Sequence, residues 1–433
     1  MLSLKTVSSP RLTTLILGGL ALLLVIYIIL FPDEAFQSSL QGLSIWWKLV
    51  FPALLPFLIL TEILRGMGVL HGLGALLEPL LRMLFRLPGV GGWILALGLT
   101  AGAPSGAIAV GQLRRDKLVT RDEAERLLAL SHLLSPVFLI TIVGVGFLHD
   151  AKSGLALAVI HYASALLVAF IERFTYVRRI AERQVVLNRR AAAHAVPRDG
   201  LFVKSAAALR AAQAADGRTF GKLLGDSVSH SVQQLMAVGG LIMIFSVVIH
   251  VVTLSGFLSS AAQVLAVFGL GAAAQTQEQL AAITPGLLEV HLGAYAVSQN
   301  NVFSHAWQYA LLSAVFAWGG LATHAQVQSF TLNTDIRYSA FLRSRLLLSI
   351  IASVATLLCW NRLYDWIAQV DTPAWLTVSA QASANWTWQN ENLWPLLSPL
   401  MLWFSGILLL MLTLSVFIAF FFRDNNRGHS SEL

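Results

Sequence analysis

The sequence predicts a polytopic α-helical membrane protein, and three observations favour this fold class. Mean hydropathy is +0.71, and 56% of the residues are hydrophobic. Only 12% are charged, whereas a soluble domain carries roughly 25%. Apolar runs of about 20 residues, the length that crosses a bilayer as a helix, recur along the 433-residue chain.

Each apolar run is expected to be a helix or a broken helix. Segment 66–86 is weak and broken, and segments 90–112 and 281–300 are interrupted by glycine and proline. The segments are 12–31, 45–64, 66–86, 90–112, 127–149, 154–171, 228–253, 256–271, 281–300, 307–330, 341–360 and 396–422.

Basic residues set the orientation, because Lys and Arg concentrate in cytoplasmic loops. Lys5 and Arg11 precede the first span, which predicts a cytoplasmic N-terminus and an uncleaved signal-anchor at 12–31. The polar stretch 172–226 holds more basic than acidic residues and is predicted to be a cytoplasmic connector. Basic residues near the end of the chain place the C-terminus on the same side.

Segment 90–112 is predicted to be a re-entrant hairpin with its tip at Gly102, Pro104, Ser105 and Gly106. Basic clusters flank it on both sides, so both of its ends belong at the cytoplasmic face. Backbone groups released by the break cannot face lipid and must line a cavity or be buried in protein. The N-terminus of the half-helix after the break would attract an anion. Close packing of small residues is the competing explanation.

The second half repeats this order of parts in the opposite orientation. Segment 281–300 is a second re-entrant candidate, entered from the external face. Each half also holds an interrupted helix, broken at Ser135-Pro136 in the first half and at Gly319-Gly320 in the second. Inverted repeats with matching broken helices indicate a transport site near the bilayer midplane.

The chain is accordingly divided into five regions. They are a signal-anchor span with an external loop (1–44), a first repeat with its return helix (45–171), the basic connector (172–226), a second repeat (227–345) and C-terminal spans with a Trp-rich external loop (346–433).

Polar residues near the breaks complete the candidate site. An ionisable pair such as Glu289 and His291 at membrane depth is a functional hypothesis, as a proton relay or a cation site, unless it lies at a hydrated helix end. His324 and Gln326 are candidate hydrogen-bond donors to substrate oxygens, or a polar contact between helices. The predicted substrate-binding set is Gly102, Pro104, Ser105, Gly106, Ser135, Pro136, Glu289, His291, Gly319, Gly320, His324 and Gln326.

The sequence lacks the short motifs that are typical of the common enzyme classes. The metalloprotease, serine-hydrolase and phosphate-loop signatures are all missing from the sequence, so we expect neither an enzyme nor an ATPase. Cys359 is the only cysteine, which argues against a disulfide framework or a Cys-based metal site. We therefore expect no cofactor and no metal. We also expect no nucleic-acid partner, because the basic residues cluster between apolar spans, where they act as topology signals.

Several short stretches resemble the sporulation integral membrane proteins of the YlbJ type. Those proteins carry the gate, or nucleoside-recognition, region shared with concentrative nucleoside transporters and the membrane part of ferrous iron transport protein B. The resemblance spans roughly residues 45–360, and its most specific piece is Gly-Leu-Thr-Ala-Gly-Ala-Pro-Ser-Gly-Ala at 98–107. The other matching stretches are 51–57, 87–92, 125–128, 286–289 and 319–326.

The resemblance implies a role in spore formation, in which the protein moves dipicolinic acid across a membrane. The two repeats and their broken helices predict that a small anionic solute is transported by alternating access. It implies a multi-pass protein of the bacterial cell membrane or the membrane surrounding the forespore. The alternatives are a channel-like pore and a non-transporting scaffold for a sporulation complex. The coupling ion, H⁺ or Na⁺, stays open, as does assembly as a homo-oligomer or with other membrane proteins.

Overall fold

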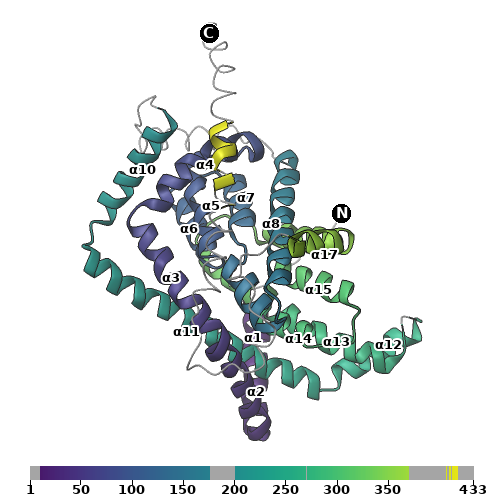
Figure 1. Cartoon of the computed structure of the whole chain (residues 1–433). Coiled ribbons are helices and arrows are strands. Elements are labelled where there is room, and N and C mark those ends of the chain that lie inside the picture. Colours follow the sequence, from purple (N-terminus) through teal and green to yellow (C-terminus); the bar gives the residue numbers. More distant parts are fainter. Residues whose placement is uncertain are drawn as a thin grey trace, which may run out of the picture.

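The computed structural model describes residues 10–175, 200–269, 271–369, 406, 409–410 and 412–417. Every regular element in this part of the chain is a helix, which confirms the predicted all-α class (Figure 1). Within the described residues, the helices that are long and apolar enough to cross a membrane cover 32–66, 151–172, 220–254, 305–330 and 338–369. A further span arises if Val69–Phe85 and Gly89–Thr100, bent by 117° relative to each other, are counted together.

The described part of the N-terminal region is helical apart from a bend at Phe31. Helix α1 (Pro10–Leu30) is followed by α2 (Pro32–Ile45), which continues through the π-helical segment η1 (Trp46–Val50) into α3 (Phe51–Gly66). The loop expected within residues 1–44, after the first span, is therefore wrong. Pro32 suits the start of a helix, and Asp33 and Glu34 fall in its first turn, where acidic side chains interact favourably with the helix dipole.

Helix α11 (Phe220–Leu254) packs along α2 and α3 (Figure 1). The indole Nε1 of Trp46 donates a hydrogen bond to the Leu235 carbonyl at 3.0 Å, and Ser246 Oγ donates to the Ser38 carbonyl at 2.7 Å. At 35 residues, α11 is about 50 Å long and exceeds the roughly 30 Å apolar core of a bilayer. We call α2, η1, α3 and α11 the α3–α11 wall.

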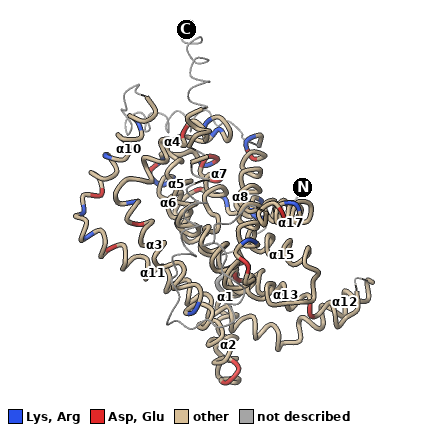
Figure 2. The backbone as a smooth tube through the Cα atoms, viewed as in Figure 1, with Lys and Arg blue, Asp and Glu red and all other residues tan. Residues whose placement is uncertain are grey.

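Apart from Lys48 in η1, the charged side chains of the α3–α11 wall lie near the ends of its helices (Figure 2). On α11 they are confined to Lys222 and Asp226 in its first turns, next to α10 (Leu201–Asp216). Arg218 joins these two helices, since it contacts Asp216 at 2.7 Å and Asp226 at 3.1 Å. Helix α10 lies in the predicted basic connector and packs against α4; residues 176–199 lie outside the described part.

The first half continues with α4 (Val69–Phe85), the short turn η2 (Gly89–Gly91), α5 (Gly92–Thr100) and α6 (Ser105–Arg115). Helix α7 (Arg121–Ser131) follows, with a capping box between Thr120 and Glu123. A non-helical break separates it from the π-helical segment η3 (Phe138–Phe147), and α8 (Ala151–Glu172) and η4 (Arg173–Thr175) complete this half.

The second half has the same order of parts after α11. It contains the short helix α12 (Phe257–Val267), the pair α13 (Ala273–Leu288) and α14 (Val290–Ser298), the pair α15 (His305–Trp318) and α16 (Gly320–Phe330), and the long α17 (Tyr338–Gln369). The short helices α4 and α12 lie at opposite ends of the molecule (Figure 1). This arrangement agrees with the inverted repeat expected from the sequence. At 11 residues, α12 is too short to span.

Ion pairs join the two halves next to α6 and α7. Arg114 on α6 contacts both carboxylate oxygens of Asp335 at 2.7 and 2.8 Å. Arg337 contacts both oxygens of Glu125 on α7 at 2.9 and 2.7 Å. The loop between α16 and α17 is therefore fixed to the first half.

The C-terminal predictions are only partly covered. Helix α17 extends through Trp366, so the start of the predicted Trp-rich loop is helical. The remaining tryptophans of that loop, and most of segment 396–422, lie outside the described residues. The five predicted regions remain predictions.

Candidate functional site between two hairpin tips

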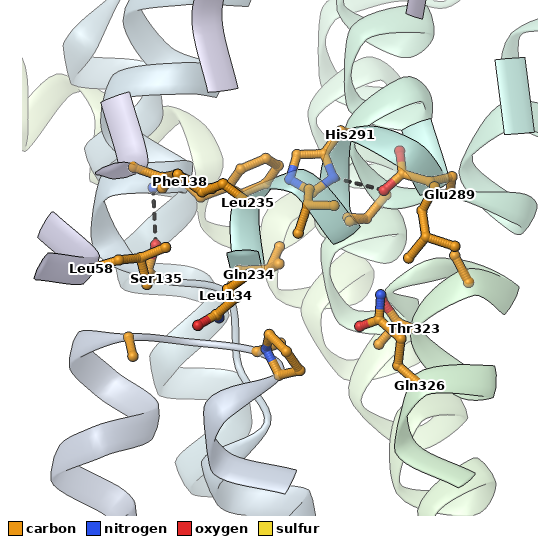
Figure 3. Close-up of a pocket in the computed structure, with 18 of the residues that line it drawn as sticks. Leu58, Leu134, Ser135, Phe138, Gln234, Leu235, Glu289, His291, Thr323 and Gln326 are labelled. Atoms are coloured by element: carbon orange, nitrogen blue, oxygen red, sulfur yellow. Dashed lines mark hydrogen bonds and ion pairs between the residues drawn. The ribbon is translucent and has the colours of Figure 1, made fainter. Parts of the chain in front are cut away.

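The predicted break at Gly102–Gly106 is a real interruption between α5 and α6. Residues 101–104 are non-helical, and Gly102 has φ +70°, a conformation that favours glycine. The chain turns over at this loop, and helical segments lead away from both of its ends in the same direction (Figure 3). Helices α5 and α6 therefore form a hairpin, which we call the first hairpin.

The first hairpin packs against the break in α7. The amide of Ala103 donates a hydrogen bond to the Leu133 carbonyl at 2.8 Å. A Cβ added to Gly102 would lie 2.8 Å from the Ser135 amide nitrogen, and one added to Gly106 would lie 2.4 Å from the Ser131 carbonyl oxygen. The non-helical loop of the first hairpin and the break after α7 thus share a hydrogen bond and pack against each other. Irregular backbone at membrane depth is tolerated when it is buried in protein in this way.

A second hairpin is formed by α13 and α14. Gly286 and Gly293 are in close contact, since a Cβ on Gly293 would lie 2.1 Å from the Gly286 Cα. Glu289 stands between the two helices in extended conformation. Beside this tip, α15 and α16 are separated by Gly319 and Gly320, with φ +84° and +81°. The interrupted segment 281–300 is therefore a helical hairpin that lies against a broken helix.

A cavity of about 70 Å³ lies where the two hairpin tips meet the α3–α11 wall (Figure 3). The first hairpin contributes Ala101, Ala103 and Pro104, and the second contributes Glu289, Val290 and His291. The break after α7 adds Leu134 and Ser135, η3 adds Phe138, and α16 adds Ala322, Thr323 and Gln326. The α3–α11 wall contributes Leu54, Phe57, Leu58, Gln234, Leu235, Val238 and Leu241.

Glu289 and His291 form the charged element of the cavity. Glu289 Oε1 lies 2.6 Å from His291 Nδ1, and Oε2 accepts a hydrogen bond from the Leu292 amide at 2.8 Å. Glu289 is only 4% exposed. The His291 ring meets Phe138 edge to face at 4.9 Å between centroids. The carboxylate therefore caps α14 while it orients the imidazole.

The two hairpin tips differ in their electrostatics. Glu289 occupies the N-terminus of α14, so the positive end of that helix is already neutralised. At α6 the N-cap is Pro104, which makes no side-chain capping hydrogen bond, and Pro104 lines the cavity. The anion attraction expected from the sequence therefore belongs to the first tip alone.

The structure brings only part of the predicted set to the cavity surface. Pro104, Ser135, Glu289, His291 and Gln326 line it. The predicted glycines are not among the lining residues; Gly102, Gly106 and Gly320 instead permit close backbone contact. Ser105, Pro136 and His324 are not among the lining residues.

His324 has protein partners on both ring nitrogens. Its Nε2 lies 3.1 Å from the Trp318 carbonyl oxygen and its Nδ1 lies 3.0 Å from the Tyr338 hydroxyl. His324 on α16 therefore links α15 and α17 through these contacts. This arrangement corresponds to the polar contact between helices that was the alternative to substrate binding.

The sequence reasoning missed Gln234, Thr323 and the apolar side chains of the α3–α11 wall. Gln233-Gln234 is a polar pair within an apolar span, and such pairs are a functional signal in membranes. Thr323 lies three residues after the Gly319-Gly320 break. The apolar wall residues carry no comparable signal, because only the packing of α3 against α11 brings them to the cavity.

Comparison with known proteins agrees with this architecture. Residues 47–151, which include the first hairpin and the broken helix beside it, match the nucleoside-recognition (Gate) family. The chain also belongs to the family of YlbJ-type sporulation integral membrane proteins. It is 38% identical over 360 residues to the sporulation integral membrane protein YlbJ of Bacillus subtilis (strain 168), covering 82% of this chain and 84% of that protein. The resemblance found in the sequence is thereby confirmed.

Proposed function

We propose that this protein transports a small anionic solute across a membrane by alternating access, and that it is not an enzyme. The observation that carries the proposal is the position of the cavity. Two hairpin tips and two helix breaks, contributed by both halves of the chain, converge on it. Matching interrupted helices at one central site are the arrangement expected of a secondary transporter.

Dipicolinic acid, an aromatic dicarboxylate, is the proposed substrate. Support for its identity comes from the resemblance to YlbJ-type proteins and from the name of the Bacillus relative, which places that relative in sporulation. The chemistry of the cavity is compatible with it. Phe57 and Phe138 offer aromatic surface for a ring, while the α6 N-terminus, His291 and the side chains of Gln234, Thr323 and Gln326 offer donors to carboxylate oxygens.

The cavity must open for such a ligand to bind. Its volume of about 70 Å³ is well below the roughly 300 Å³ at which pockets for drug-sized ligands begin. Movement of the hairpin tips away from the α3–α11 wall would enlarge it, because these elements form its opposite sides. We propose the cell membrane or the membrane surrounding the forespore as the location, with both termini in the cytoplasm.

Uptake of labelled dipicolinate into proteoliposomes tests this function. A carrier with a binding site gives saturable uptake that unlabelled dipicolinate inhibits. Flux that rises linearly with concentration would favour a channel, and no flux would favour the scaffold. Gln326→Ala should raise the half-saturating concentration several-fold. Gln233→Ala, one position away from Gln234 and outside the lining residues, is the matched control and should behave as wild type.

A further inference from the structure

We propose that the solute is carried together with protons, and that the Glu289–His291 pair binds them; this inference rests on the proposed transport function. The pair lies at the tip of the second hairpin, inside the cavity and beside Gly320 of the broken α15–α16 helix. A change in the charge of the pair therefore acts on an anion bound in the cavity and on the backbone around Gly320.

The geometry favours a proton over a sodium ion. Both oxygens of Glu289 are already in hydrogen bonds, Oε1 with His291 Nδ1 and Oε2 with the Leu292 amide. A hard cation is held by several oxygen ligands at once, and among the described lining residues Glu289 is the only carboxylate. A proton needs only the basic atoms of the pair, and a 2.6 Å contact between carboxylate and imidazole can share one.

Electrostatic repulsion between the anionic solute and Glu289 favours protonation of the pair when the solute binds. Among the described residues, the lining contains no Lys or Arg, and its only carboxylate is Glu289. An anion that enters beside a deprotonated Glu289–His291 pair is repelled. An anion that enters beside a protonated pair is no longer repelled, because the pair changes from net negative to neutral or positive. By linkage, the anion and the proton then strengthen each other's binding.

The elements packed around the pair add no second titrating group to the cavity. Helix α11, η3 and α16 contribute the neutral side chains of Gln234, Phe138, Thr323 and Gln326. The charged or titratable side chains of α3, α11, α13, α14, α15 and α16 lie outside the lining; they are Glu62, Arg65, Lys222, Asp226, His230, His250, Glu278, Tyr295, His305, Tyr309 and His324. The pH dependence of solute binding is therefore assigned to Glu289 and His291.

Equilibrium binding of dipicolinate to the full-length purified protein between pH 6 and 8 tests the inference. Dipicolinate stays ionised over this range, so the pH dependence reports on the protein. Wild type should lose affinity toward higher pH, by up to tenfold per unit for one linked proton. Glu289→Gln keeps an acceptor for the Leu292 amide but cannot titrate, and should flatten this dependence. Gln326→Ala should bind more weakly and keep the wild-type slope.

Uptake into proteoliposomes gives a second readout. An inwardly directed proton gradient, with the membrane potential clamped, should drive accumulation by wild type, and a sodium gradient should not. Binding that is independent of pH, or accumulation driven by sodium alone, would overturn the proton assignment while leaving transport intact. Failure to bind or transport dipicolinate under every condition would overturn the proposed function, and this inference with it.

Discussion

Gly320 lies directly against Glu289: a Cβ built on Gly320 would stand 2.8 Å from the Glu289 Cα. The break of the α15–α16 helix and the tip of the second hairpin are therefore one packed unit. Gly320 also has φ +81°, which side chains other than glycine rarely adopt. The position of the Glu289–His291 pair depends on this glycine.

Replacement of Gly320 by alanine should disable transport. The new methyl group overlaps the hairpin backbone, and the left-handed conformation adds strain of about 1–3 kcal/mol. We expect dipicolinate uptake to fall at least tenfold at equal protein level in the membrane. Gly240→Ala on α11 is the control, because nothing lies within 4 Å of its Cβ position. Normal uptake by Gly320→Ala would show that the contact is unimportant.

Leucine at Gly102 and Gly106 should likewise abolish uptake while membrane insertion persists. The Cβ positions of these glycines meet the backbone of Ser135 and Ser131, so leucine would force the first hairpin away from the α7 break. Insertion depends on hydrophobicity, which leucine does not lower. Gly225→Leu, where the Cβ position is open, serves as the control. Uptake at the wild-type rate would refute the assignment of this tip to the site.

The Arg337–Glu125 pair should stabilise the contact between the two halves. Glu125 is buried, so Arg337→Leu removes the main partner of its carboxylate. We expect a loss of about 1–3 kcal/mol, the usual cost of a buried group left without its partner. Thermal unfolding in detergent measures this. The double variant Glu125→Leu/Arg337→Leu should recover part of the loss, since the buried carboxylate of Glu125 is then removed together with its partner; a further loss would contradict this account.

Acid should weaken the Arg114–Asp335 contact. Hydrogen bonding to the Arg114 guanidinium holds the pKa of Asp335 below its usual value. A carboxyl group with a depressed pKa in the folded protein stabilises it above its unfolded pKa of about 3.9, and this contribution is lost as pH falls through the folded pKa. The melting temperature of wild type should exceed that of Asp335→Asn at pH 7, and the difference should shrink below about pH 4. Because Asp335 is half exposed, the difference should be small. A difference that grows with acid would contradict the assignment.

Local backbone chemistry explains why both hairpins could be predicted from sequence. Gly102 and Pro104 interrupt the apolar segment of the first hairpin, and Pro285 and Gly286 interrupt that of the second. Flanking basic residues indicate where the first hairpin enters. The loop after the first span was predicted wrongly because Asp33 and Glu34 read as a polar connection, although they begin α2. Phe57 reaches the cavity through the packing of α3 with α11, a long-range contact that has no local sequence signature.

Reactivity of a cysteine at Ala103 tests most directly the claim that the cavity between the hairpin tips is the transport site. Ala103 lines the cavity, whereas Ala107 on α6 is fully buried and provides the control. The exposed Cys359 is first replaced by serine. In that background, Ala103→Cys should react with a small aqueous thiol reagent and Ala107→Cys should not. Saturating dipicolinate should slow the reaction at Ala103→Cys about tenfold; labelling at the same rate with and without dipicolinate would contradict the proposed site.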